Sequence, residues 1–479
     1  MNALWKNIPA KEPLSLGKLR ILFQHLLQGY ERVSVVDRKR TKNTFEECVL
    51  GIEEDPYYRS MTRGSSAGIP YKIDLAKVGL KGKQILFGVK EKFDLDTHGC
   101  HVLRKDVEDE IKYIKRGKKH IIPYEVSEKD ECLPREKVLE GKIRLFAVNS
   151  ALAGVLKRMY GGQFRSWFAH NRIYNGSAIG INVYSKDWDF MCKHLLFGKE
   201  ENLKPQFIAM DVSKFDGTVS RPWMYNFYQI VCDWYGFSSE ERKIQMEIFE
   251  SQMHSFHIFK GKLFERVGSQ SSGDEYTALL NTVLSQAYAY YAISLLINGS
   301  NNSIIHCEDF EFLHMLEDIS RNVRIIALGD DIVISVRESW YWYDTVNEEN
   351  LIKVYNKFGV NATTDSKDGS VYKHRYLKDI TFLKRKTYYC KQMKRYIGKL
   401  DVSSIMKSVQ WMRDNDPHYE SYRLTLQHAL EELALHEDPV FDRYVAQIRE
   451  RGRERVHLNL LSYDKQWLKR ACLLREDYF

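Results

Sequence analysis

The hydrophobic pattern predicts a β-hairpin over Ile325–Val336, where two short apolar and mostly β-branched runs flank the sequence Gly-Asp-Asp at Gly329–Asp331. Apolar runs of this length, separated by glycine and aspartate, are typical of paired strands joined by a tight turn. A second buried-strand run, Phe207–Met210, stops at Asp211. We therefore expect buried strands that carry carboxylates at their ends.

Apolar residues at helical spacing predict several α-helices. They recur in this way over Leu16–Leu27, and a long helix that includes Thr277 is expected to continue to about Ile297. A shorter helix is expected at Lys353–Phe358, where Gly359 would end it. From about residue 393 onward helical periods dominate and predict a separate, largely helical C-terminal domain with helices at Tyr422–His436, Pro439–Glu450 and Tyr463–Leu474.

Chain length and charge indicate the number of subdomains and the kind of partner. A chain of 479 residues is too long for one small core, so several subdomains are expected. The formal net charge is +8, and the basic residues gather in clusters that suit a polyanionic partner. A solvated surface is the alternative for each cluster, namely Lys112–His120, Lys384–Lys386 and Arg449–Arg455.

The spacing of the cysteines and the hydropathy limit the kinds of site and the cellular compartment that are expected. The eight cysteines include no close Cys-x-x-Cys pair, which argues against a zinc site and against a disulfide framework and fits a reducing, cytosolic setting. Lys6, Lys11 and Glu12 interrupt the apolar residues of the N-terminus, so neither a signal peptide nor a membrane span is expected there. The longest apolar run, near Ala287–Ile297, is too short to cross a bilayer.

The acidic tip of the predicted hairpin is a candidate metal site. Two adjacent carboxylates repel one another between hydrophobic strands unless a cation neutralises them, and oxygen-only ligation favours Mg²⁺ or Mn²⁺ over zinc. Asp211 could pair with Asp330 across neighbouring strands, so that three carboxylates hold two metals about 3.5–4 Å apart for in-line phosphoryl displacement. A surface turn that merely favours glycine and aspartate is the alternative.

Two further segments suggest contacts with phosphate or nucleic acid. Basic residues recur through the extended segment Lys129–Phe146, a pattern that suits a triphosphate as well as a nucleic-acid backbone. An ordinary surface hairpin is the alternative there. The segment Ser65–Tyr71 is rich in small residues and closed by Pro70, so its backbone can approach a partner closely. A simple connector is the alternative for this loop.

A hydroxyl-rich loop, Gly268–Tyr276, leads into the long predicted helix. Thr277 and Asn281 lie four residues apart and project from the same helical face. A buried asparagine is costly without a partner, and a ribose hydroxyl could serve as the partner of Asn281. The alternative is an ordinary amphipathic helix capped by Ser272 or Asp274.

Together these segments resemble the motifs of viral RNA-dependent RNA polymerases of the picornavirus-like group, the 3D-type polymerases, over about residues 60–390. Seven motifs in the order of that family make the resemblance specific. Many relatives have tyrosine where this chain has Leu328, a change that leaves the carboxylates intact. The motifs from A to G are Asp211-x4-Asp216, Ser272-Gly273-x3-Thr277-x3-Asn281, Gly329-Asp330-Asp331, Lys367, Phe382–Arg385, Lys129–Phe146 and Ser65–Tyr71.

The resemblance implies an α+β fold shaped as a closed right hand, with fingers, a palm built on a small antiparallel sheet with helices, and a helical thumb. The N-terminal 60 residues and the C-terminal domain are assigned by analogy alone. The implied division is fingers with motifs G and F at 1–200, palm with motif A at 201–235, a fingers insertion at 236–262, palm with motifs B to E at 263–392, and thumb at 393–479.

The resemblance also implies roles for individual residues. Asp211 and Asp330 would bridge two Mg²⁺ ions, which Mn²⁺ could replace, with Asp331 as an auxiliary ligand. Lys367 would be a general acid that protonates the departing pyrophosphate. The implied nucleotide-binding residues are Lys129, Lys137, Arg144, Asp216, Ser272, Gly273, Thr277 and Asn281, and the implied RNA-binding residues are Ser65, Ser66, Gly68, Pro70, Lys384 and Arg385.

The implied reaction is the attack of a primer 3′-hydroxyl on the α-phosphate of a ribonucleoside triphosphate, directed by an RNA template, in the replication of a positive-strand RNA virus genome. The implied partners are template and primer RNA, NTPs, other viral replication proteins and, as a candidate primer, a genome-linked protein. The implied location is the host cytoplasm, at membrane-associated replication complexes.

Two other functions share parts of this pattern. Reverse transcriptases have the same palm carboxylates but usually block a 2′-hydroxyl with a bulky aromatic side chain, whereas Asp216 and Asn281 offer hydrogen bonds to it. A catalytically silent RNA-binding scaffold with a degenerate palm would be expected to lose carboxylates, and none is lost here. The sequence therefore favours a polymerase that uses ribonucleotides.

Overall fold

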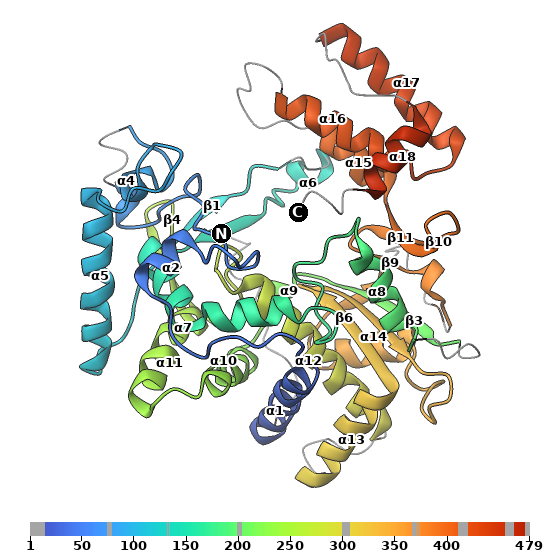
Figure 1. Cartoon of the computed structure of the whole chain (residues 1–479). Helices are drawn as coiled ribbons and strands as arrows, with labels where there is room; N and C mark the ends of the chain where they lie inside the picture. Colours follow the sequence, from blue (N-terminus) through green and yellow to red (C-terminus); the bar gives the residue numbers. More distant parts are fainter. Residues whose placement is uncertain are drawn as a thin grey trace.

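The computed structural model of the chain describes residues 15–73, 79–131, 133, 135–198, 204–298, 307–365, 370, 372, 374–410, 420–455 and 464–474. This part of the chain contains many helices together with three sheets (Figure 1). We call them the central sheet, the outer sheet and the hairpin sheet. The fold therefore mixes helices and sheets, as the hydrophobic pattern predicts.

The central sheet contains the predicted hairpin. Its strands run antiparallel to their neighbours in the order β6 (Val323–Leu328), β7 (Asp331–Val336), β3 (Gln206–Val212) and β8 (Ala362–Thr364). The pairing of β6 with β7 extends to Leu328 opposite Asp331, so Gly329 and Asp330 form the tip. The prediction of a hairpin with an acidic tip is confirmed.

Apolar side chains cover both faces of the central sheet, which explains why its strands are continuous apolar runs rather than alternating ones. On one face Ile326 and Val333 pack with residues of α8 (Lys186–Leu195). On the other face Ile325 and Ile334 belong to the main core, which they share with residues of α1 (Leu16–Arg32), α10 (Arg221–Tyr235), α12 (Thr277–Ile297), α13 (Asp309–Asn322) and α14 (Glu348–Lys357).

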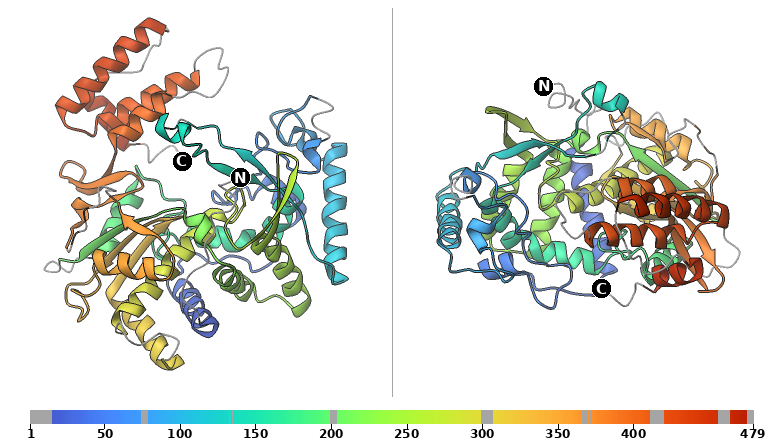
Figure 2. Two further views of the ribbon diagram at one scale, coloured as in Figure 1. Left: turned by 180° about the vertical axis from the view of Figure 1, so that it is seen from behind. Right: turned by 90° about the horizontal axis from the view of Figure 1, so that it is seen from above.

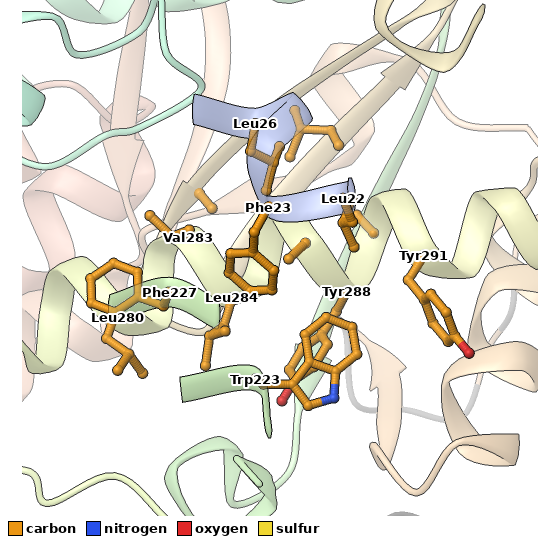
Figure 3. Packing of buried hydrophobic residues seen from close by; sticks show 14 of the residues in the cluster. Leu22, Phe23, Leu26, Trp223, Phe227, Leu280, Val283, Leu284, Tyr288 and Tyr291 are labelled. Atoms are coloured by element: carbon orange, nitrogen blue, oxygen red, sulfur yellow. The ribbon is translucent and has the colours of Figure 1, made fainter. Parts of the chain in front are cut away.

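Helix α12 is the centre of the main core (Figure 3). It is apolar on nearly all sides, as expected for a helix with protein around it rather than one with a solvent face. Trp223 of α10 lies edge-on to Tyr288 of α12, with ring centroids 4.6 Å apart, and its ring centroid is 6.0 Å from that of Phe23 in α1. Helices from distant parts of the sequence therefore hold α12 against the central sheet.

The outer sheet joins segments that are more than 100 residues apart in the sequence. Its order is β2 (Leu145–Val148), β1 (Tyr124–Glu128), β4 (His254–Phe259) and β5 (Lys262–Val267), and β1 and β4 are parallel. Helices on this side of the molecule are α2 (Phe45–Leu50), α4 (Gln84–Phe87), α5 (His98–Lys115), α7 (Ala151–His170) and α11 (Ser239–Met253).

The connection between β1 and β2 differs from the sequence prediction. The segment Lys129–Phe146 was expected to be extended, but it contains the short helix α6 (Arg135–Leu139), in which no side chain is buried. In Figure 1 and in the left view of Figure 2, α6 lies between the region of α5 and the C-terminal helices. The basic segment therefore spans the space between two regions of the molecule.

The C-terminal helices follow the hairpin sheet, whose order is β9 (Thr381–Phe382), β10 (Arg385–Cys390) and β11 (Arg395–Leu400). The predicted helices are confirmed with shifted ends, but helical structure does not begin at residue 393, because β11 intervenes. These helices lie apart from α5 and α11 in all views (Figures 1 and 2), and they are α15 (Val402–Gln410), α16 (Glu420–Leu433), α17 (Asp438–Arg455) and α18 (Lys465–Leu473).

Membrane-spanning helices were not expected from the hydropathy. Among the helices of the described residues, none combines the length with the apolar composition needed to span a bilayer.

Candidate active site

Three carboxylates meet at one end of the central sheet. Asp211 is the penultimate residue of β3, Asp331 begins β7, and the side chain of Asp330 is exposed at the tip between β6 and β7. The pairing of Met210 with Ile332 brings the ends of β3 and β7 together. Asp211 therefore lies near the end of a strand that neighbours β7, and Asp330 lies in the turn that leads into β7. The pairing of Asp211 with Asp330 through a metal stays a prediction.

Electrostatics support the proximity of the three carboxylates. The pKa of Asp331 is raised to about 6, chiefly by burial and also by the negative charges of Asp330 and Asp211. A hydrogen bond from the backbone N–H of Leu383 (2.8 Å) and the charge of Lys384 act in the opposite direction. A carboxylate that is destabilised by burial and by like charges gains from a nearby cation.

The donor set fits a hard divalent cation, although it is not a closed cage. Among the described residues, no three side chains of His, Cys, Asp or Glu are grouped as a ready-made metal site. Mg²⁺ is commonly held by one or two carboxylates together with substrate phosphates and water, so an open set of oxygen ligands is what it requires. Asp211, Asp330 and Asp331 supply such a set.

A hydrogen bond links the turn after β3 to helix α12. Asp216 lies in the short helix α9 (Phe215–Thr218), and its Oδ1 accepts a hydrogen bond of 2.7 Å from Nδ2 of Asn281. The Oδ1 of Asn281 is buried and has no hydrogen-bond partner in the part of the chain that the structure describes. An unpaired buried amide oxygen is costly, so a hydrogen-bond donor at this position would be favourable.

Neighbouring groups shift the pKa of the Asp216 carboxyl in both directions. Burial raises its pKa and the nearby Asp330 raises it further, while the hydrogen bond from Asn281 and the charges of Arg266 and Arg144 lower it. Arg266 was not identified from the sequence. It lies on β5, donates a hydrogen bond to Ser269 Oγ, and has a buried Nε without a partner among the described residues. A lone arginine near the end of a strand gives no signal in one sequence.

The loop before α12 lies against the outer sheet. Gly273 bridges to Val148 of β2, and a Cβ at position 273 would lie 2.0 Å from the backbone oxygen of Ala147, so only glycine permits this approach. Ser272 is exposed beside it. The hydroxyl of Thr277 is within 2.7 Å of the backbone oxygen of Ser271, to which it donates, so this side chain stabilises the loop.

A fully buried ion pair anchors the same loop. The Nζ of Lys157, in α7, contacts Oδ2 of Asp274, and neither side chain has any solvent exposure. Asp274 Oδ2 also accepts hydrogen bonds from the hydroxyl of Tyr124 (2.7 Å) and from Asn149 Nδ2 (3.1 Å), while Oδ1 accepts one from the backbone N–H of Tyr276 (2.9 Å). The sequence suggested only a helix cap for Asp274 and no role for Lys157.

The predicted phosphate-binding residues lie on the β1–β2 connection. Lys129 and Arg144 share the carboxylate of Glu131, at 3.4 and 3.3 Å, and the Arg144 side chain is 67 % exposed. Lys137 is exposed on α6. Glu131, whose side chain is 20 % exposed, holds Lys129 and Arg144 on this connection, while Arg144 and Lys137 present their charge to solvent.

The small-residue loop at 65–70 is anchored at one side. Ser65 and Pro70 are exposed, Ser66 is half-buried, and Gly68 is buried. The buried Nζ of Lys83 donates a hydrogen bond of 2.5 Å to Ser65 Oγ, and burial lowers the pKa of Lys83 to about 8. The loop is thus held in place while part of it faces solvent.

The two basic residues predicted to contact RNA after β9 lie in different environments. Lys384 is exposed and acts electrostatically on Asp331. Arg385 is only 5 % exposed, and its guanidinium pairs with Glu432 of α16 and donates to the backbone oxygen of Gly398 (2.8 Å). The expectation that Arg385 binds RNA is therefore contradicted, because its donors are used inside the protein. Lys367 lies outside the described residues.

Sequence comparisons give a consistent picture. A family profile described as viral RNA-dependent RNA polymerase matches residues 23–453. The replicase polyprotein of acute bee paralysis virus (strain Rothamsted) is 29 % identical over 410 residues, covering 84 % of this chain and 20 % of the polyprotein. That of Drosophila C virus (strain EB) is 28 % identical over 411 residues, covering 84 % of this chain and 22 % of the polyprotein. The chain thus spans about a fifth of the length of these curated relatives.

Comparison with solved structures addresses the fold. The structure of a sicinivirus protein titled "3Dpol RNA dependent RNA polymerase" superposes with a TM-score of 0.74, covering 98 % of this chain and 87 % of that one, at 16 % sequence identity. At this identity the similarity shows the fold alone. It confirms the α+β right-hand architecture expected from the sequence motifs.

Proposed function

We propose, because this chain belongs to the family of viral RNA-dependent RNA polymerases, that it catalyses RNA-templated RNA synthesis by transferring a nucleotide from an NTP to a primer 3′-hydroxyl. The observation that carries the proposal is the meeting of Asp211, Asp330 and Asp331 at one end of the central sheet. Extension of a defined RNA hairpin primer with the four NTPs tests it. Absence of metal-dependent extension would contradict it.

The division of the chain into fingers, palm and thumb remains the one proposed from the motifs. The palm at 201–235 and 263–392 corresponds to the central sheet with α12 to α14, and the thumb at 393–479 to β11 and the C-terminal helices. The fingers at 1–200 and the insertion at 236–262 share the outer sheet. The proposed end of the insertion at residue 262 is the first residue of β5, which pairs with β4 up to Val267.

The carboxylates have the main chemical task in this proposal. Asp211 and Asp330 would hold two Mg²⁺ or Mn²⁺ ions, with Asp331 as an auxiliary ligand. When bound, such ions favour deprotonation of the 3′-hydroxyl and neutralise charge on the triphosphate. Leu383 keeps the Asp331 carboxylate oriented through its backbone N–H. The exposure of Asp330 leaves its oxygens free for a shared ligand.

Nucleotide binding would combine phosphate contacts with recognition of the sugar. Lys137 and Arg144 are exposed cations on the connection between β1 and β2, Lys129 there is half-buried, and all three suit the triphosphate. Asp216 and Asn281 are the proposed sensors of the ribose hydroxyls. The motif B loop at Ser272–Thr277 would support the nucleotide through its backbone, since the Thr277 hydroxyl is already used within the loop.

The path of the RNA involves fewer residues than the motifs suggested. We propose that the loop with Ser65, Ser66, Gly68 and Pro70 guides the template and that Lys384 contacts the primer backbone. Arg385 is excluded from this set because it is buried and paired.

Partners and location follow from the relatives and stay proposals for this chain. Template RNA, primer RNA and NTPs are required by the reaction. A genome-linked protein as a primer and other viral replication proteins are further proposed partners. Its proposed place of work is the host cytoplasm, at membrane-associated replication complexes.

Two competing functions can be separated from this one by simple assays. A reverse transcriptase would extend the same primer with dNTPs at least as well as with NTPs. A silent RNA-binding scaffold would bind the hairpin without extending it. The hydrogen bond between Asp216 and Asn281, with the free amide oxygen beside it, favours the use of ribonucleotides.

We expect Asn281→Ala and Asp216→Ala to reduce discrimination against dNTPs. A site whose polar groups bond a hydroxyl rejects an analogue without it because those groups are left unpaired. The measurement is the ratio of kcat/KM for NTP over dNTP in each variant and in the wild type. An unchanged ratio in two variants that still incorporate NTPs would contradict the proposal.

We expect Lys367→Arg to slow incorporation while nucleotide affinity is kept, if Lys367 protonates the departing pyrophosphate. A positioned proton donor typically contributes about 10²–10⁴-fold to rate, and arginine keeps the charge but scarcely releases a proton. Single-turnover incorporation as a function of pH, in H₂O and in D₂O, compares the wild type with Lys367→Arg and Lys367→Leu. An arginine variant that matches the wild type throughout would leave Lys367 with a charge-only role.

A further inference from the structure

Two hydroxyl groups of helix α12 hold the tip of the metal-ligand hairpin. The backbone N–H of Gly329 donates a hydrogen bond of 2.8 Å to Thr282 Oγ1, and Ser285 Oγ donates one of 2.6 Å to the backbone oxygen of Gly329. Thr282 Oγ1 also donates its proton to the backbone oxygen of Ala278 at 2.7 Å, which leaves a lone pair for Gly329. One residue of the tip is thus bonded to α12 through both of its backbone polar groups.

This double contact fixes the conformation of the tip. Gly329 has φ +65°, in the left-handed region, and a Cβ built there meets nothing within 4 Å. Glycine is therefore required by the backbone conformation rather than by lack of space. Thr282 is fully buried and Ser285 is 3 % exposed, so water does not compete for these hydrogen bonds. The two peptide groups that flank Gly329 determine where Asp330 leaves the turn.

Helix α12 also carries Asn281, one of the two residues proposed to sense the ribose hydroxyls. Asn281 is the neighbour of Thr282 and lies four residues before Ser285, and it donates to Asp216. We propose that Thr282 and Ser285 are positioning residues, which set the direction of the metal ligands Asp330 and Asp331. Together with Asn281 they make α12 the rigid element that couples ribose recognition to metal placement. This inference rests on the proposed metal role of the carboxylates.

Two test variants each remove one hydrogen bond to Gly329, and two further variants are controls. Thr282→Val keeps the shape of the side chain and removes the acceptor for Gly329 N–H, whereas Thr282→Ser keeps the hydroxyl. Ser285→Ala removes the donor to the Gly329 oxygen. Ser294→Ala is a matched control, because Ser294 is a fully buried serine of the same helix whose hydroxyl donates only to the backbone oxygen of Tyr290 (2.8 Å).

The primary readout is metal binding rather than activity. Free Mn²⁺ is titrated by electron paramagnetic resonance in a complex of the polymerase, an RNA hairpin primer ending in a 3′-deoxynucleotide, and the matching NTP, which cannot react. We expect Thr282→Val and Ser285→Ala to weaken Mn²⁺ binding roughly three- to tenfold, in keeping with the loss of one hydrogen bond at each site. Thr282→Ser and Ser294→Ala should bind Mn²⁺ like the wild type.

A second readout separates positioning from a general loss of stability. In single-turnover extension, the Mg²⁺ concentration for half-maximal rate should rise by a similar factor in Thr282→Val and Ser285→Ala, while the rate at saturating Mg²⁺ recovers. A lower melting temperature with unchanged metal dependence in both variants would overturn the inference. Asp330→Asn serves as the reference: if it too binds Mn²⁺ like the wild type, the metal role of the carboxylates fails rather than the role of α12.

Discussion

Asp330→Asn is expected to lower the rate of nucleotide incorporation to less than a tenth of the wild-type rate without a change in fold. The substitution removes one ligand charge from an exposed tip and touches no packed contact. A tenfold loss corresponds to an increase of roughly 1.4 kcal/mol in the activation barrier. This is a modest effect for the loss of a carboxylate that holds a catalytic metal ion. Single-turnover extension of an RNA hairpin primer at saturating NTP and Mg²⁺ measures the effect.

A matched control for this variant is Asp344→Asn. Asp344 is also exposed, with 90 % of its side chain accessible, and its carboxylate lies 3.6 Å from His374 Nε2. This variant should keep the wild-type rate, and both variants should melt at the wild-type temperature. Retention of more than a tenth of the wild-type rate in Asp330→Asn would rule out the assigned ligand role.

Lys157→Met is expected to lower the free energy of unfolding by about 3 kcal/mol or more, the usual cost of leaving one partner of a buried ion pair alone. Asp274 would then be a fully buried carboxylate whose remaining partners are neutral groups. Unfolding in urea, followed by tryptophan fluorescence, measures the change. Activity should fall as well, because the same carboxylate orders the loop that precedes α12.

The control is a pair on the surface. Lys353→Met breaks the contact of Lys353 with Glu349, whose side chains are 62 % and 47 % exposed, and exposed pairs contribute at most about 1 kcal/mol. The double variant Lys157→Met/Asp274→Leu should recover part of the loss, since it leaves no buried charge alone. If Lys157→Met costs no more than Lys353→Met, the buried pair is not a stabilising anchor.

The sequence was sufficient for those parts of the site that lie close together along the chain. The hairpin at Ile325–Val336 and the long helix ending near Ile297 have strong local patterns, and the structure has both. Asp216 and Asn281 were predicted to sense the sugar hydroxyls in one network, and the structure has a direct hydrogen bond between their side chains. Local periodicity therefore explains most of the central sheet and its helix.

The parts that were missed depend on contacts between distant segments. Lys157 and Asp274 are 117 residues apart, and neither position has an unusual neighbourhood in the sequence. Arg385 was misjudged for a different reason. A run of three basic residues was taken as one surface, but β10 begins at Arg385, and the alternation of a strand places Arg385 inside while its neighbours Lys384 and Lys386 stay exposed. Period-2 alternation could have given this result.

The interior position of Arg385 also bears on how the molecule would accommodate duplex RNA in the proposed function. Its pairing with Glu432 joins the hairpin sheet to α16, and Arg395 adds hydrogen bonds to the backbone oxygens of Tyr184 (3.0 Å) and Leu473 (3.1 Å). An outward swing of the C-terminal helices would break this buried ion pair and the hydrogen bonds of Arg395 together, and these contacts oppose it. The C-terminal helices are therefore braced against the hairpin sheet, and in the proposed function they would form a wall beside the growing duplex.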